Sequence, residues 1–114
     1  MVVLVLFLDQ QFYRDDHLFV HLRHQVVMLD GETVTLTRME YRLLALLAQY
    51  AGEVVPRPIL LTQLWGSLPA PHTRLLEPHI RHLREKLGVY ADQYIETVPK
   101  IGYRFRPAVL TGHL

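Results

Sequence analysis

The segment RLLEPHIRHLREKLG, residues 74–88, concentrates basic side chains that could bind an anion. Arginine can donate two parallel hydrogen bonds to phosphate oxygens or to O6 and N7 of a guanine, and histidine can donate to an acceptor on a base edge. Proline offers only apolar contact, for instance to a thymine methyl. If the segment is a helix, the residues on or beside its exposed surface are Arg74, Pro78, His79, Arg81, His82, Glu85 and Lys86, with Arg84 at the margin. Taken alone, such a cationic face is usually only solvated surface.

The segment is predicted to be helical despite the proline near its start. The first four N–H groups of a helix have no partner within it, so proline costs little there and about 3 kcal/mol or more further in. Pro78 therefore requires the helix to begin near residues 74–76. Gly88 closes it. The buried stripe follows the spacing i, i+4, i+7, i+11 and consists of Leu76, Ile80, Leu83 and Leu87.

Charge is unevenly distributed along the chain, although the formal net charge is only +1. Residues 1–36 carry two basic and five acidic side chains, whereas residues 74–106 carry seven basic and four acidic ones. This asymmetry indicates an anionic partner for the C-terminal half.

Two further helices are predicted upstream. Thr37 and Glu40 have capping-box spacing, so the first helix begins near Arg38, and Gly52 supplies a left-handed stop. Its predicted buried face is Met39, Leu43, Leu46, Leu47 and Tyr50.

The second helix follows a break at Pro56. Pro58 suits a helix start, and Gly66 ends the helix. Its apolar contacts are Leu60, Leu61, Leu64 and Trp65, and the prolines after Gly66 indicate a loop up to Thr73.

Short β-prone runs flank the three helices. HLFVHL and QVVML, followed by the turn LDGE with its Asp30-Gly31 hairpin signal and by TVTL, predict a small antiparallel sheet that includes the opening run VVLVLFL. That opening run is too short for a membrane span and lacks the flanks of a signal peptide. It is either a strand buried on both faces or one that has lost a neighbour. Near the other end, YIETV and YRF predict a basic hairpin across residues 99–102.

These parts predict an α+β fold, the winged helix–turn–helix, with an N-terminal antiparallel sheet, three helices and a C-terminal β-hairpin wing. In this architecture the third helix enters the DNA major groove and the wing lies against the flanking backbone or minor groove. A chain of 114 residues suffices for one such domain. We assign residues 1–16 to an N-terminal strand or linker remnant, 17–106 to the domain and 107–114 to a tail.

The chain resembles a known family in four ordered blocks. LTRMEYRLLALLAQYAGEVV, LLTQLWG, HIRHLREKLG and YIETVPKIGYRF are similar to the effector domain of the OmpR/PhoB family of bacterial response regulators, over about residues 17–106. The resemblance implies binding to direct DNA repeats as head-to-tail pairs, in the bacterial cytoplasm. It also implies contact with RNA polymerase through the loop after the second helix, here Ser67, Leu68, Pro69, Ala70, Pro71 and His72.

Residue by residue, the resemblance implies a set of DNA contacts. Arg74, Arg81 and Arg84 match positions that face phosphates or base edges. Pro78, His79 and His82 match positions that face bases, and the wing contributes Thr97, Lys100 and Tyr103.

The sequence departs from the family pattern at three places. Glu77-Pro78 replaces an acidic residue followed by a β-branched one, and Pro56 replaces a capping serine. Pro99 replaces a wing arginine, a role that Lys100 could take. A receiver domain would need over a hundred further residues, so the chain is either a stand-alone regulator or one domain of a longer signalling protein.

Other classes of function find less support. Ser67 is the only serine, and no glycine-rich phosphate cradle or recognisable acid–base pair is present, so we expect no enzyme and no cofactor. Without cysteine, metal binding would depend on histidines, grouped as His17, His21 and His24 and as His79 and His82; we expect no metal site. The main alternative is a winged-helix module for protein interaction. We expect Leu64, Trp65, Ile101 and Phe105 to be core residues.

Overall fold

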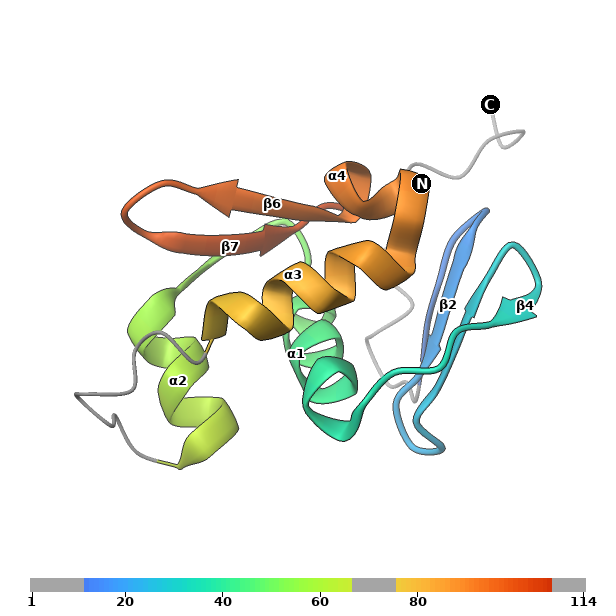
Figure 1. The fold of residues 1–114 in the computed structure, drawn as a ribbon, viewed down its shortest axis with the longest axis horizontal. Coiled ribbons are helices and arrows are strands. Elements are labelled where there is room, and N and C mark those ends of the chain that lie inside the picture. Colours follow the sequence, from blue (N-terminus) through green and yellow to red (C-terminus); the bar gives the residue numbers. More distant parts are fainter. Residues whose placement is uncertain (1–11, 67–75, 108–114) are drawn as a thin grey trace.

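The computed structural model describes residues 12–66 and 76–107 of the 114-residue chain. An N-terminal sheet contains strands β1 (Phe12–Arg14), β2 (Leu18–His21), β3 (Val26–Leu29) and β4 (Glu32–Thr33), paired antiparallel in that order. A second sheet, with strand order β5-β7-β6, contains β5 (Val54–Pro56), β6 (Ile95–Val98) and β7 (Gly102–Phe105). The main helices are α1 (Arg38–Gln49), α2 (Arg57–Trp65) and α3 (Leu76–Leu87). The predicted order of sheet, three helices and hairpin is therefore the order found (Figure 1).

The N-terminal sheet has one face in the core. In β2, Leu18 and Val20 are completely buried and alternate with half-exposed residues. Asp30 and Gly31, with φ of 51° and 84°, form the two-residue loop between β3 and β4, as the Asp-Gly signal predicts. β1 lies within the segment that we assigned to a remnant before residue 17. Because it pairs with β2 and its Tyr13 is completely buried, it is part of this sheet. The opening run VVLVLFL lies outside the described residues.

The first helix begins as its capping signal predicts. The Glu40 N–H donates to Thr37 Oγ1 at 3.1 Å, and the Thr37 N–H donates to Glu40 Oε1 at 2.9 Å. The predicted buried face is correct for Leu43 and Leu47 but wrong for Tyr50, which is 46% exposed. Tyr50 follows the last helical residue with ψ of 35°, so the helical periodicity no longer directs its side chain inward.

The second and third helices also match their signals. α2 has Pro58 in its first turn and ends at Gly66 with φ of 82°, and Pro56 at its N-cap makes no side-chain capping bond. In α3, Pro78 lies in the first turn, and the stripe Leu76, Ile80, Leu83 and Leu87 is buried. Among the described residues, no helix has the length and apolar character needed to cross a membrane.

Three short elements after α1 were not predicted. A short 3-10 helix, Gly88–Tyr90, leads into α4 (Ala91–Tyr94), whose Tyr94 is completely buried. Strand β5 contains only three residues, one of them a proline, so it carries little signal of its own, and it forms only by pairing with β7. Figure 1 shows α3 in the middle of the molecule, with the β6–β7 hairpin along one side and the N-terminal sheet beyond its C-terminal end.

Four residues were expected in the core on sequence grounds. Leu64 and Phe105 are buried, and Trp65 is half-buried against the core. The prediction is wrong for Ile101, which is 52% exposed. Ile101 follows Lys100, whose φ is 67°, in the turn between β6 and β7, so it lies beyond the strands whose alternation would direct it inward.

Gly102 is required where β5 meets β7. A Cβ atom at this position would lie 2.1 Å from the Val55 carbonyl oxygen and 2.9 Å from the Pro56 Cα, both of them backbone atoms. We expect Gly102→Ala to lower the free energy of unfolding by about 3 kcal/mol or more, because the strands must move apart. Urea titration measures this loss. The matched control is Gly66→Ala, where a Cβ would meet nothing within 4 Å and only the positive φ costs about 1–2 kcal/mol. Equal losses in the two variants would contradict the close approach.

Candidate nucleic-acid interface

The polar side of α3 is the centre of the predicted interface. The buried stripe holds one side of the helix in the core, and Arg81 and His82 on the other side are exposed. Arg81 Nη2 lies 3.3 Å from His82 Nε2. Pro78 and His79 are half-buried, and the His79 ring lies 6.0 Å from the Trp65 ring, centre to centre. The structure therefore brings these four predicted residues together on α3.

Two parts of the predicted interface lie outside the described residues. They are Arg74 and the proposed polymerase loop, Ser67 to His72. Their roles remain predictions.

Arg84 connects α3 to the wing. Its Nη2 donates to the Ile95 carbonyl oxygen at 3.0 Å and to Thr97 Oγ1 at 2.7 Å, both on β6. The side chain of Arg84 thus extends from the margin of the helix and ends on the hairpin. Arg84 and Thr97, both predicted to contact DNA, contact each other in this structure.

Glu40 links the start of α1 to the last turn of α3. Its carboxylate, with a side chain 3% exposed, lies 2.6 Å from Lys86 Nζ. Burial by itself raises the pKa of Glu40, but the hydrogen bonds from Lys86 and from the Thr37 N–H outweigh it and hold that pKa below the ordinary 4.5. Lys86, expected on or beside the outer surface, therefore ends in an interhelical ion pair.

A third polar cluster joins the start of α3 to α2 and to the wing. Arg57 Nε and Nη2 each donate to a carboxylate oxygen of Glu77 at 2.7 Å. The Tyr103 hydroxyl, on β7, lies 3.4 Å from Glu77 Oε2, and Tyr103 is only 7% exposed. Tyr103 was predicted to contact DNA from the wing, and its hydroxyl here faces Glu77. Sequence reasoning did not identify Arg57, because nothing local signals a partner twenty residues away.

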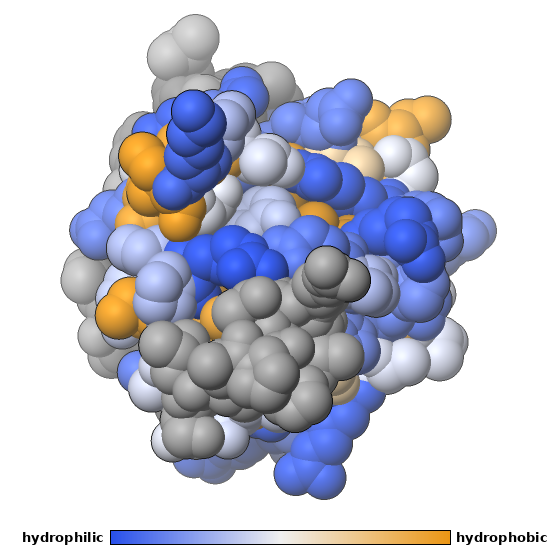
Figure 2. Space-filling model, turned by 60° about the vertical axis from the view of Figure 1, so that its left-hand side comes forward, coloured by the Kyte–Doolittle hydropathy of each residue, from blue (hydrophilic) through white to orange (hydrophobic). Residues whose placement is uncertain are grey.

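A hollow of about 460 Å³ separates the wing from the starts of α2 and α3. It is lined by Arg57, Pro58, Glu77, Thr97, Val98, Lys100, Ile101, Gly102 and Tyr103. Lys100 and Ile101 are exposed at the wing tip. Figure 2 shows this end of the molecule, where hydrophilic residues predominate and a few hydrophobic ones interrupt them. Because Lys100 and Ile101 of the wing tip line the same hollow as Glu77 of α3, the wing tip and the start of α3 border one continuous surface.

The histidines do not form a metal-binding group in the described part of the chain. Within residues 12–66 and 76–107, no three His, Cys, Asp or Glu side chains lie close enough together to hold a metal ion. The His21 and His24 rings lie 4.5 Å apart, whereas His17 hydrogen-bonds to Asp30.

Two sheets, three main helices and a hairpin beside the third helix define a winged helix–turn–helix domain. The family model described as "Transcriptional regulatory protein, C terminal" matches residues 31–105. The chain belongs to this family. Its predicted resemblance to the winged-helix effector domains of OmpR/PhoB response regulators is confirmed.

Three similar proteins illustrate the relationship. The Escherichia coli transcriptional regulatory protein HprR is 38% identical over 80 residues, which cover 69% of this chain and 36% of HprR. The structure of the Klebsiella pneumoniae RstA DNA-binding domain in complex with RstA box has a TM-score of 0.78 and 31% identity, covering 87% of this chain and all of that one. The Thermotoga maritima response regulator DrrB, an OmpR/PhoB homolog, has a TM-score of 0.77 and 27% identity, covering 86% of this chain and 45% of DrrB. The chain spans about a third of the length of the curated relatives it matches.

The Glu40–Lys86 pair predicts a defined acid dependence of stability. Because the pKa of Glu40 is lowered in the folded state, the pair stabilises the fold above pH 4.5, and this contribution is lost as the pH falls through the folded pKa. We expect Lys86→Met to lower the free energy of unfolding by about 2 kcal/mol at pH 7. Below pH 4.5 the difference from the wild type should shrink. Denaturant unfolding at several pH values measures both.

Arg81→Met is the control for that variant, since it removes an exposed cation from the same helix. Its effect on stability should stay within about 0.5 kcal/mol. A Lys86→Met deficit that is the same at pH 4 and pH 7 would contradict the role of Glu40.

Proposed function

We propose that the chain binds double-stranded DNA with sequence preference and acts as the effector domain of a bacterial transcriptional regulator. The exposed side of α3 enters the major groove, and the β6–β7 hairpin lies against the adjacent backbone or minor groove. Counterion release at phosphates supplies most of the affinity, and side chains of α3 supply the preference. Such a regulator acts in the cytoplasm, where bacterial DNA is.

The observation that carries this proposal is the open, polar side of an anchored helix. Arg81 and His82 are exposed, whereas the neighbouring Glu77, Arg84 and Lys86 hold α3 to other elements. Because contacts with other elements fix α3 at several points, the side chains that would contact the bases keep a fixed geometry. Base recognition requires such a geometry. The similarity to the RstA DNA-binding domain, whose structure was solved in complex with RstA box, supports the same assignment.

Each proposed contact follows from side-chain chemistry. Arg81 binds a phosphate, while His79 and His82 donate to base edges and Pro78 touches a thymine methyl. Lys100, exposed at the wing tip, binds the backbone or enters the minor groove. Arg84 acts mainly by fixing the orientation of the wing relative to α3, because its guanidinium is hydrogen-bonded to β6.

Two partners complete the proposal. We infer that two copies bind direct repeats head to tail, and that residues 67–72, which lie outside the described part of the chain, contact RNA polymerase. Both inferences rest on the family resemblance.

Selection from a random duplex pool near physiological salt tests the proposal, with fluorescence anisotropy on the enriched site. We expect Arg81→Ala to weaken binding to every duplex and to reduce the salt slope by about 1, because one phosphate contact is lost. We expect His82→Ala to change the preferred bases, at a cost of about 1–3 kcal/mol at the affected position.

Arg23→Ala is the matched control, because it removes an exposed arginine between β2 and β3, away from α3. It should bind like the wild type. Thermal unfolding confirms that each variant is folded. No enrichment by a folded wild-type protein would reject DNA recognition and favour the protein-interaction module.

A further inference from the structure

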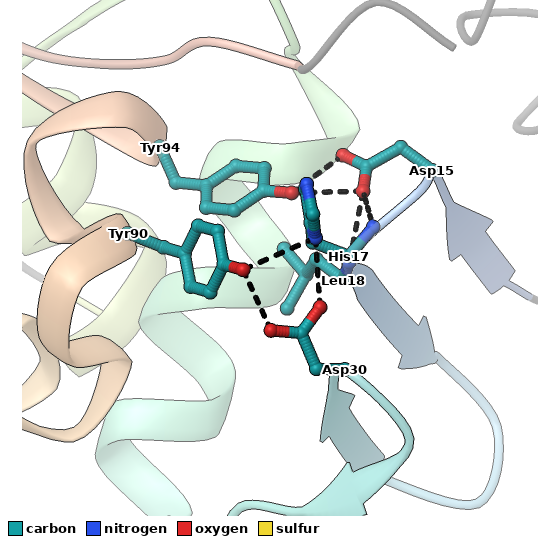
Figure 3. A network of polar contacts seen from close by, with 6 residues as sticks. All are labelled: Asp15, His17, Leu18, Asp30, Tyr90 and Tyr94. Atoms are coloured by element: carbon teal, nitrogen blue, oxygen red, sulfur yellow. Dashed lines mark hydrogen bonds and ion pairs between the residues drawn. The ribbon is translucent and has the colours of Figure 1, made fainter. Parts of the chain in front are cut away.

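A layered polar contact joins the N-terminal sheet to the segment that follows α3 (Figure 3). The inner layer is centred on Asp15, which is 8% exposed. The Tyr94 hydroxyl lies 2.8 Å from both carboxylate oxygens of Asp15, and the backbone N–H groups of His17 and Leu18 donate to Oδ1 at 2.8 Å. The Tyr13 hydroxyl donates to the other oxygen. This inner contact is buried and is therefore shielded from solvent.

The outer layer consists of His17, Asp30 and Tyr90. His17 Nδ1 lies 2.7 Å from Asp30 Oδ1, and the Tyr90 hydroxyl donates to Asp30 Oδ2 at 2.6 Å. The Tyr90 oxygen is also 3.2 Å from His17 Nδ1, and the two rings lie 4.7 Å apart, centre to centre. Figure 3 shows the three side chains converging from separate elements. The side chains of His17 and Asp30 are 39% and 50% exposed, so this layer can exchange protons with solvent.

The outer layer spans a junction between parts of the fold that are distant in sequence. Asp30 lies in the β3–β4 loop, and its N–H donates to the His17 carbonyl oxygen at 2.7 Å, which holds these two residues together. Tyr90 lies three residues beyond Leu87, the last residue of α3, after a turn at Gly88 with φ of 60°. The contact therefore ties the end of α3 to the N-terminal sheet.

We propose that His17, Asp30 and Tyr90 form a proton-dependent latch between the N-terminal sheet and the end of α3. An imidazolium at His17 attracts the Asp30 carboxylate, whose second oxygen accepts the Tyr90 hydroxyl. When His17 loses its proton, the charge that orients Asp30 disappears and the Tyr90 contact weakens. The buried Asp15–Tyr94 contact keeps the sheet attached, so the latch loosens one edge of the junction without releasing the sheet.

The charges around His17 favour its protonated form. The hydrogen bond with Asp30 is the main influence, and the negative charges of Asp30, Asp15 and Asp16 add to it, so the pKa of His17 lies above 6.5. Tyr90 faces the ring from the segment after α3 and is uncharged at neutral pH; its hydrogen bond, followed by that of His17, lowers the pKa of Asp30. A raised folded pKa means that the latch stabilises the fold fully below pH 6.5, and that this contribution is lost as the pH rises through the folded pKa.

NMR of the full chain between pH 5 and 9 tests the latch, with the ring signals of His17 and Tyr90 as probes. We expect the Tyr90 signals to move with the His17 midpoint, and that midpoint to exceed 6.5. Asp30→Asn should lower the His17 midpoint and abolish the Tyr90 response. Asparagine tolerates the positive φ of residue 30, so this variant keeps the loop.

Thermal unfolding supplies an independent measurement. The melting temperature of His17→Gln should fall below that of the wild type at pH 6, and the gap should narrow at pH 8.5. His24→Gln, the matched control, should show no gap that depends on pH in this way. Tyr90 signals that do not follow His17, a His17 midpoint unchanged by Asp30→Asn, or an equal gap at both pH values would each overturn the latch.

Discussion

The arrangement of the helices depends on the paired carboxylate of Glu40, which bonds to the Thr37 N–H and to Lys86. Glu40 completes the capping box of α1. It also forms an ion pair with Lys86 in the last turn of α3, forty-six residues later. A buried carboxylate is costly unless its oxygens are paired, so the start of α1 and the end of α3 must lie together for either to be stable. The cap thus acts as a tertiary constraint on the helix that carries the proposed reading residues.

That constraint is repeated along α3 by charges on its flanks. Glu77 at the start binds Arg57 of α2, and Arg84 near the end binds β6 of the wing. Since successive residues of a helix point about 100° apart, the same sequence supplies a buried stripe, two anchoring flanks and an open side. The cationic composition of α3 therefore overstates the charge available to DNA, because two of its cations hold other parts of the domain.

The N-terminal sheet extends this arrangement beyond the C-terminal end of α3. Asp15 and Tyr94 hold the sheet through a buried contact, and His17, Asp30 and Tyr90 add an exposed one. The two layers differ in their access to water. In the proposed latch, the exposed contact of His17 with Asp30 responds to pH, whereas the buried contact of Asp15 with Tyr94 stays formed.

The sequence by itself determined the features whose causes are local. The capping box of Thr37, the tolerated Pro78, the Asp30-Gly31 loop and the buried stripe of α3 each depend on residues within a few turns of one another, and each is found as predicted. Only the tertiary structure decided where longer side chains end: Arg84 on β6, Lys86 on Glu40, and Arg57 on Glu77. It also created β5, which needs β7 as a partner, and left Ile101 exposed in a turn. Periodicity specifies which side of an element faces inward, but a flexible charged side chain takes its partner from whichever element the fold brings within reach.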